Sequence, residues 1–161
     1  MSISAEQIKL RTAGPGDDNF ILSVYASTRE DELQRVPWTS EQKEVFVRMQ
    51  YAAQKQHYAA SYPQASHDVI CVEETAIGRI YLDRSADGLH ILDITVLPQY
   101  RNEGIGSELL RRLLREAGQS GKAVTIYVET FNPSVRLFER LGFQKDAEKD
   151  FQFLMKWQAK Q

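Results

Sequence analysis

The segment from Val96 to Ser107 contains the pattern most suggestive of chemistry. It reads as the end of an apolar strand, a turn with Gly104 and Gly106, and the start of a helix. Glycine lets backbone N–H groups approach a bound group closely, and the first turn of a helix adds unpaired donors at the positive end of its dipole. The segment therefore predicts a site for an anion such as a pyrophosphate, although two glycines here can equally make only a tight connection.

Two common phosphate-binding loops do not match this segment. No Gly-Lys-Ser/Thr sequence follows the glycines, as a P-loop requires, and the third glycine of a dinucleotide-binding fingerprint is missing. The anion site therefore has to be interpreted from its wider context.

Composition argues against a nucleic-acid binder. The 161 residues suit one domain over 1–161, and 20 basic against 22 acidic residues leave no basic excess for neutralising phosphates. The N-terminus lacks the pattern of a secretory signal, and no apolar run is long enough to cross a membrane. With a lone cysteine, Cys71, we expect a cytoplasmic protein that binds neither nucleic acid nor membrane.

Periodicity predicts the elements that must position the anion site. Ile105, Leu109, Leu113 and Ala117 form one face of a helix directly after the glycines. Asn132 is expected to cap a short helix that starts at Pro133. Strands are predicted around 8–10, 69–72, 76–82, 89–97, 124–128 and 151–157, with the strand at 89–97 central, and a helix follows the acidic residues at 17 and 18.

A second, longer helix is predicted from its cap. Thr39 with Gln42 forms a capping pair just before a long stretch without glycine or proline. Its buried stripe is predicted to be Val45, Phe46, Met49 and Ala52.

Two motifs together indicate a family. Arg101-x-x-Gly104-x-Gly106, after a Val-x-Pro strand end, resembles the acetyl-CoA motif of the GCN5-related N-acetyltransferases. Asn132 to Phe143 resembles the second motif of that family, and two motifs at the right separation are more specific than either alone. The resemblance covers roughly residues 69 to 157 and implies an α/β fold: a mixed, mostly antiparallel sheet of six or seven strands, helices on both faces and a splayed cofactor cleft.

The resemblance implies acetyl-CoA as the cofactor, with its pantetheine arm in the gap beside a bulged central strand and its pyrophosphate on the glycine loop. The residues it assigns to cofactor binding are Ile94, Val96, Arg101, Asn102, Glu103, Gly104, Ile105, Gly106, Ser107, Asn132 and Phe138.

The reaction that the resemblance implies is acetyl transfer to a primary amine of a small molecule or peptide, by direct attack in a ternary complex. Several members hold a Glu or His base at the level of His90, whose ordinary pKa suits that role. His90 is equally explained as a residue at the start of a strand. Asp93 and Glu129 are substitute bases.

Two departures from the family pattern bear on catalysis. Glu139 stands where many members have a Tyr that protonates the leaving thiolate, so Tyr127 or water has to serve, although a strand Tyr is by default a packing residue. Asn102 and Glu103 replace a common glycine and basic residue, and an inward Glu103 would repel phosphate. These departures keep open a non-catalytic acyl-CoA-binding module, and behind it a nucleotide-binding regulatory domain.

The acceptor site is the least determined part. In the family the first two helices and their connection form its wall, which here contains Glu30, Trp38, Gln54 and Tyr58. The charged residues near Glu30 are also typical of a solvated loop. No Cys or His cluster supports a metal, Cys71 is expected in the core, and the resemblance also allows a homodimer.

Overall fold

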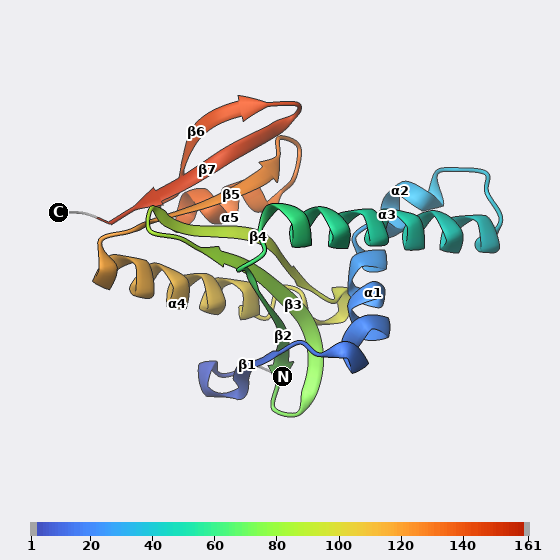
Figure 1. Ribbon diagram of the computed structural model, residues 1–161, viewed down its shortest axis with the longest axis horizontal. Helices are drawn as coiled ribbons and strands as arrows, with labels where there is room; N and C mark the ends of the chain where they lie inside the picture. The colour runs from blue at the N-terminus through green and yellow to red at the C-terminus, as the bar shows by residue number, and fades with distance from the viewer. Residues whose placement is uncertain (1–2, 160–161) are drawn as a thin grey trace.

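Seven strands form one mixed sheet in the computed structural model, which describes residues 3–159 (Figure 1). The strand order is β1-β2-β3-β4-β5-β7-β6, and every neighbouring pair is antiparallel except the parallel pair β4 and β5. The strands are β1 (Ile8–Thr12), β2 (Ser66–Val72), β3 (Thr75–Arg84), β4 (Gly88–Val96), β5 (Ala123–Glu129), β6 (Gln144–Lys149) and β7 (Gln152–Gln158). The predicted sheet and its central strand β4 are confirmed.

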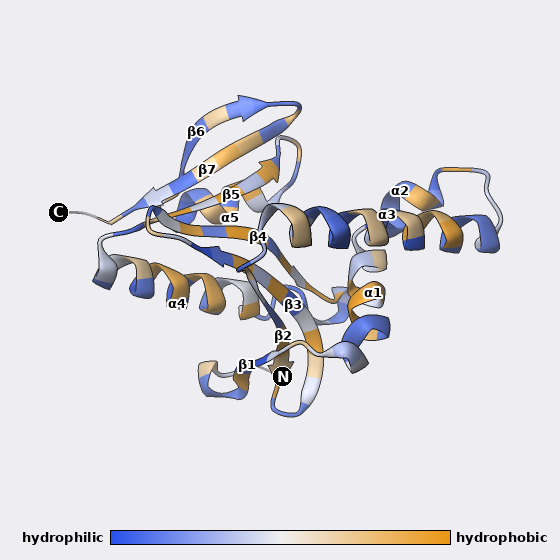
Figure 2. Cartoon of the chain, in the orientation of Figure 1, coloured by the Kyte–Doolittle hydropathy of each residue, from blue (hydrophilic) through white to orange (hydrophobic). Residues whose placement is uncertain are grey.

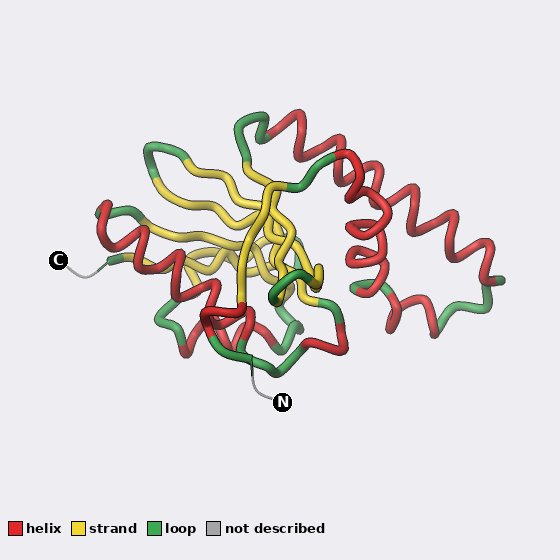
Figure 3. The backbone as a smooth tube through the Cα atoms, turned by 90° about the horizontal axis from the view of Figure 1, so that it is seen from below, coloured by secondary structure: helices red, strands yellow, loops and turns green. Residues whose placement is uncertain are grey.

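Helices cover both faces of the sheet, as predicted (Figures 1 and 3). From below, α1, α2 and α3 form a group to one side of the strands, and α4 runs along another side (Figure 3). The helices are α1 (Asp18–Ser27), α2 (Glu30–Gln34), α3 (Ser40–Ser61), α4 (Ile105–Ser120) and α5 (Ser134–Arg140).

The main aliphatic core lies between the sheet and the helices α4 and α5. Leu109, Leu110 and Leu113 of α4 pack with Leu89 and Ile91 of β4, all nearly inaccessible to water. Figure 2 shows the apolar residues of α4 interspersed with hydrophilic ones, as the 3.6-residue period requires. The predicted buried face of α4 is confirmed, and this packing fixes the start of the helix beside the end of β4.

The prediction for the buried stripe of α3 is wrong. Thr39 does cap the helix, with its Oγ1 accepting from the Gln42 N–H, but Val45 and Met49 are 57% and 67% exposed. Phe46 is only partly buried and Ala52 is exposed, whereas Val47 is buried. The face of α3 that packs on the protein also carries Gln54 and Tyr58, so a search for apolar periodicity selects the opposite face.

Two elements, β6 and α2, escaped prediction, and β1 is exposed over most of its length. Every residue of β6 is exposed, so this edge strand carries no apolar alternation. The helix α2 has only five residues. Leu10 is 42% exposed because β1 forms the other edge of the sheet, so only Ile8 of that strand is buried. Within residues 3–159, no helix combines the length and apolar character needed to cross a membrane.

Candidate active site

The sheet opens between its two parallel strands. Pairing of β4 with β5 runs from Gly88 opposite Ala123 to Ile91 opposite Ile126 and then stops, although β4 continues to Val96. The second half of β4 is paired with β3 alone. We call this opening, where β4 leaves β5 after Ile91, the fork. It confirms the splayed sheet that the sequence predicts, and it leaves one edge of β4 at Ile94 and Val96 without a neighbouring strand.

A β-bulge marks the fork. Across β3 and β4, Asp93 lies opposite Tyr81 and Ile91 lies opposite Leu82, so Leu92 has no register partner. An extra residue of this kind bends a strand and disrupts its ladder locally. The bend therefore falls where β4 loses its pairing with β5.

The glycine loop presents a run of backbone donors. None of the N–H groups of residues 102–107 donates a hydrogen bond to another residue within 3–159, and the first helical bond runs from Glu108 N–H to the Gly104 carbonyl at 3.0 Å. Asn102 and Gly104 have left-handed backbones, with φ of 64° and 80°. Consecutive free N–H groups at a helix N-terminus bind anions. A Cβ built on Gly106 would meet no protein atom within 4 Å, so there is open space beside the donors. The loop therefore fits a diphosphate.

Side chains predicted to bind the cofactor have diverse surroundings. Arg101 and Glu103 are exposed, whereas Ile105 is 2% exposed and belongs to the core, so it offers a ligand only its backbone. Phe138 is 4% exposed and packs edge-on against the Phe143 ring at 5.3 Å. A cofactor contact of the Phe138 side chain stays a prediction.

Asn132 and Ser107 complete the predicted cofactor set. Asn132 is exposed, and its Oδ1 accepts a hydrogen bond from the Ser134 N–H at 2.9 Å, which caps α5 as expected. Ser107 is partly buried in the first turn of α4.

His90 is the second-last residue of β4 that pairs with β5, and it therefore lies beside the fork. Its Nδ1 is 2.8 Å from Thr125 Oγ1 on β5, and its ring is edge-on to Tyr127 at 5.6 Å and tilted against Tyr62 at 5.9 Å. Burial lowers the pKa of His90 below its ordinary value, against a smaller opposing effect of Asp83. The imidazole is therefore largely unprotonated at neutral pH, the state that a general base needs.

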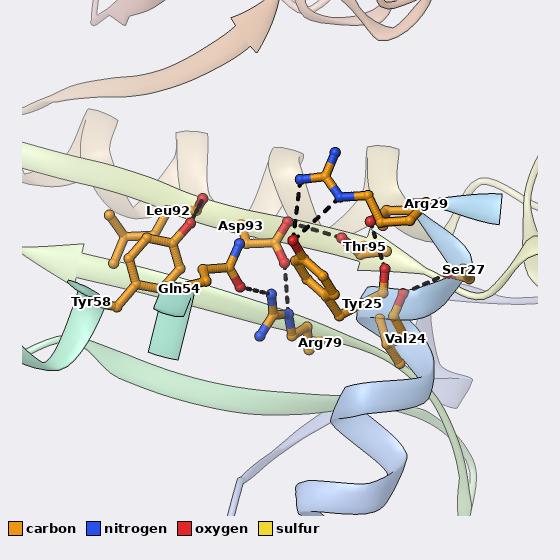
Figure 4. Close-up of polar contacts among 11 residues, drawn as sticks. Val24, Tyr25, Ser27, Arg29, Gln54, Tyr58, Arg79, Leu92, Asp93 and Thr95 are labelled. Atoms are coloured by element: carbon orange, nitrogen blue, oxygen red, sulfur yellow. Dashed lines mark hydrogen bonds and ion pairs between the residues drawn. The ribbon is translucent and has the colours of Figure 1, made fainter. Parts of the chain in front are cut away.

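Asp93 is held by a buried arginine (Figure 4). Arg79 Nε donates to Asp93 Oδ2 at 2.6 Å, and Thr95 Oγ1 donates to the other oxygen at 2.9 Å. The Arg79 side chain is 2% exposed and the Asp93 side chain 24%. Arg79 also donates to Gln54 Oε1 at 2.6 Å. Both oxygens of Asp93 are thus engaged within the protein, and Asp93 as a base stays a prediction.

The four residues predicted for the acceptor do not gather at one place. Gln54 contacts Arg79, and the Tyr58 hydroxyl donates to the Leu92 carbonyl at 3.1 Å, so both lie beside the bulge. Trp38 packs on the Phe46 ring at 5.1 Å at the opposite end of α3. At 1.5 Å per residue the two ends of this 22-residue helix are about 30 Å apart.

Glu30, the fourth predicted acceptor residue, lies on α2. It is exposed and lines a cavity of about 650 Å³ together with residues of α1 and α3. The residues that line this cavity include none of the residues of the fork.

Sequence reasoning missed Arg79 and Thr125. A charged residue inside the apolar run 76–82 was a usable signal for Arg79, because a buried charge requires a partner. Thr125 gave no such signal, since its contact depends on the register that places it opposite His90. Cys71 is buried and unbridged, as its strand position predicts. Residues 3–159 contain no group of three or more His, Cys, Asp or Glu side chains placed to hold a metal.

Comparison with known proteins agrees with this geometry. A model of the acetyltransferase (GNAT) family matches residues 26–143, most of the chain. The protein belongs to this family. We therefore interpret the fork and the glycine loop of this GNAT protein as parts of a coenzyme-A-dependent acetyltransferase.

Curated relatives match only in part. A probable spermine N(1)-acetyltransferase of Bacillus subtilis subsp. natto is 30% identical over 82 residues, which cover 49% of this chain and 48% of that protein. An N-alpha-acetyltransferase of Sulfurisphaera tokodaii is 34% identical over 59 residues, 35% of each chain. The chain thus spans about half or less of the length of these relatives.

Solved structures match over nearly the whole chain. The PaiA N-acetyltransferase from Thermoplasma acidophilum, solved in complex with coenzyme A, has a TM-score of 0.72 at 20% identity and covers 94% of this chain and 98% of its own. PH1933 from Pyrococcus horikoshii has a TM-score of 0.70 at 18% identity and covers 96% and 99%. At these identities the likeness establishes the fold.

Proposed function

We propose that this GNAT protein transfers the acetyl group of acetyl-CoA to a primary amine of a small molecule or peptide, by direct attack in a ternary complex. The observation that carries the proposal is the run of N–H groups at 102–107, none of which donates to another residue within 3–159, together with a β4 strand whose edge opens at the fork. A diphosphate followed by an extended amide-containing arm is the chemistry that such an arrangement accommodates.

Each part of the site has a distinct task in this proposal. The N–H groups of residues 102–107 hold the diphosphate, and the open edge at Ile94 and Val96 holds the arm. Acetyl-CoA supplies the acetyl group as a thioester. The bulge at Leu92 provides the peptide group that stabilises negative charge on the thioester oxygen.

His90 is the proposed general base. Most primary amines are protonated at neutral pH, so a proton must leave before the nitrogen attacks. When Nδ1 donates to Thr125 Oγ1, Nε2 is left as the acceptor for that proton. Thr125 thereby fixes the orientation of the base.

The proton for the leaving thiolate has two sources in this proposal. Tyr127 is 52% exposed and its ring is 5.6 Å from His90, so it lies on the same side of the fork. Water is the other source, because a thiolate with an ordinary pKa leaves readily. As the N–C bond forms and the C–S bond breaks, His90 takes one proton and the thiolate gains one.

Ligand-dependent unfolding tests the cofactor site first. Acetyl-CoA or CoA at about 100 times its dissociation constant should stabilise the protein by roughly 2.7 kcal/mol, and ATP should not. Stabilisation by ATP alone would favour the nucleotide-binding alternative, and no stabilisation by any of the three would remove the cofactor site.

A thiol-release assay then tests the chemistry. Because the curated relatives are named as spermine, spermine/spermidine and N-alpha-acetyltransferases, the panel should contain spermine, spermidine and peptides with free N-termini. Release of CoA with one acceptor class supports the enzyme. Binding of acetyl-CoA without release across the panel would favour the acyl-CoA-binding module, an outcome that Glu139 in place of the family's Tyr makes worth testing.

The location and the oligomeric state of the protein need separate measurements. We place the reaction in the cytoplasm, in line with the free, buried thiol of Cys71, and cell fractionation tests this. A homodimer, which the family resemblance allows, is tested by light scattering of the purified protein.

A further inference from the structure

The peptide group at the bulge is held by a residue from α3. Leu92 has no register partner on β3, and β4 has already left β5 at this point. A partly buried carbonyl needs a hydrogen-bond donor. The Tyr58 hydroxyl supplies it at 3.1 Å (Figure 4). We propose that Tyr58 is a positioning residue that fixes the bulge of β4 for acetyl transfer; this inference rests on the proposed function.

Planarity of the peptide bond explains why one hydrogen bond suffices. In a trans peptide the carbonyl of Leu92 and the N–H of Asp93 are rigidly opposed. Holding the carbonyl against α3 therefore also fixes the direction of the adjoining N–H. The peptide group at the bulge thus keeps one orientation before substrate arrives, which is the condition under which a fixed dipole lowers a barrier.

A second anchor from the same helix holds the next residue. Gln54 lies one turn before Tyr58 on α3, so the two side chains share a face. Gln54 Oε1 accepts from Arg79, which in turn donates to Asp93 at 2.6 Å. Helix α3 thus holds the backbone of Leu92 directly and the side chain of Asp93 through Arg79.

The Tyr58 hydroxyl is fixed in place and remains a donor. Its ring packs edge-on against Tyr81 at 5.0 Å and against Tyr62 at 6.4 Å. Burial raises the pKa of Tyr58 to about 12, so the hydroxyl keeps its proton at any pH at which the reaction is measured. The hydrogen bond to Leu92 is therefore present throughout that range.

Tyr58→Phe isolates this hydrogen bond, because it removes one oxygen and keeps the ring. Tyr81→Phe is the matched control: its ring neighbours Tyr58, but its hydroxyl makes no hydrogen bond with any residue in the described range. We expect Tyr58→Phe to lower kcat about tenfold, less than the loss of an oxyanion donor itself, with the KM for the amine and the Kd for CoA changed less than twofold.

Amide hydrogen exchange of the free protein supplies a readout that does not depend on turnover. Peptides covering 88–97 should exchange at least threefold faster in Tyr58→Phe than in the wild type and Tyr81→Phe. Exchange unchanged in Tyr58→Phe would overturn the proposal even if the wild type showed no acetyl transfer. A raised KM with unchanged kcat would also overturn it, because it would assign Tyr58 to acceptor binding instead.

Discussion

Protonation of His67 should make the protein less stable as the pH falls from 7.5 to 5.0. His67 on β2 stacks on Tyr81 with ring centroids 4.4 Å apart and planes 18° apart. Its Nε2 is buried and has no hydrogen-bond partner within residues 3–159. Burial lowers the pKa of His67 from 6.5 to about 4, so the folded protein holds the neutral ring.

Charges around His67 modify this effect without reversing it. Arg79 and Lys55 lower the pKa further, and Asp93 and Asp17 oppose them. The effect of Arg79 comes directly after burial in size, so the buried Arg79 cation contributes to keeping His67 neutral, and its ion-pair partner Asp93 partly offsets this.

The magnitude follows from the two pKa values. Above pH 6.5 the stabilising contribution is fully present, and it is lost as the pH falls toward 4, because the unfolded chain binds the proton first. With pKa values of 6.5 unfolded and about 4 folded, the loss between pH 7.5 and 5.0 is about 2 kcal/mol. His67 is only partly buried, so solvent screening reduces this to between about 1 and 2 kcal/mol.

Urea unfolding at pH 7.5 and 5.0 measures this loss in the wild type and in His67→Phe. Phenylalanine keeps a flat ring against Tyr81 and cannot titrate. The wild type should lose about 1 to 2 kcal/mol more than the variant between the two pH values. His90, whose pKa is also lowered, is present in both proteins, so its contribution cancels. Equal losses in the two proteins would refute the assignment of a neutral, buried His67.

Three further variants test the site and its support. Gly106→Val should abolish stabilisation by CoA, with Gly106→Ala intermediate, because the added Cβ projects into the open space beside the loop donors. The free energy of unfolding without ligand should change by less than about 1 kcal/mol. Undiminished CoA binding would contradict the proposed diphosphate position. His90→Gln should lower kcat at least about 100-fold. In the wild type kcat should fall with decreasing pH below 6.5, because burial lowers the pKa of His90 and activity is lost as the pH falls through it. The variant should lack this decrease, and a decrease that persists would point to another base. Arg79→Met should destabilise the protein by about 3 kcal/mol in urea unfolding, because it leaves the Asp93 carboxylate without its ion-pair partner. Arg84→Met removes an exposed ion pair and should cost less than about 1 kcal/mol. Similar losses in the two variants would show that burial does not strengthen the pair of Arg79 with Asp93.

Local patterns were sufficient for the part of the protein that surrounds the glycine loop. The face of α4 follows from spacing within one helix, and Gly104 occupies a left-handed position that glycine favours. The cap at Asn132 likewise depends on residues two positions apart. Such features are encoded within a few consecutive residues, which is why sequence alone predicts them.

Contacts that depend on strand register and on polar packing could not be predicted from the sequence. His90 meets Thr125 only because β4 and β5 pair in one particular register, and Asp93 meets Arg79 only because a bulge at Leu92 shifts the strand. The buried stripe of α3 was mispredicted for a related reason. That helix is held by hydrogen bonds and aromatic contacts, for which apolar periodicity gives no signal.

Because few residues of α3 are buried, this helix can accept many substitutions during evolution. Among the 22 residues of α3 only Val47 is buried, and none belongs to the main aliphatic core that joins the sheet to α4 and α5. Substitutions along most of α3 should therefore change stability by no more than about 0.5 kcal/mol each. Many mutations can thus accumulate on this helix while the glycine loop and the core stay intact, provided that Tyr58 keeps its hydrogen bond to Leu92 and Gln54 keeps its hydrogen bond to Arg79.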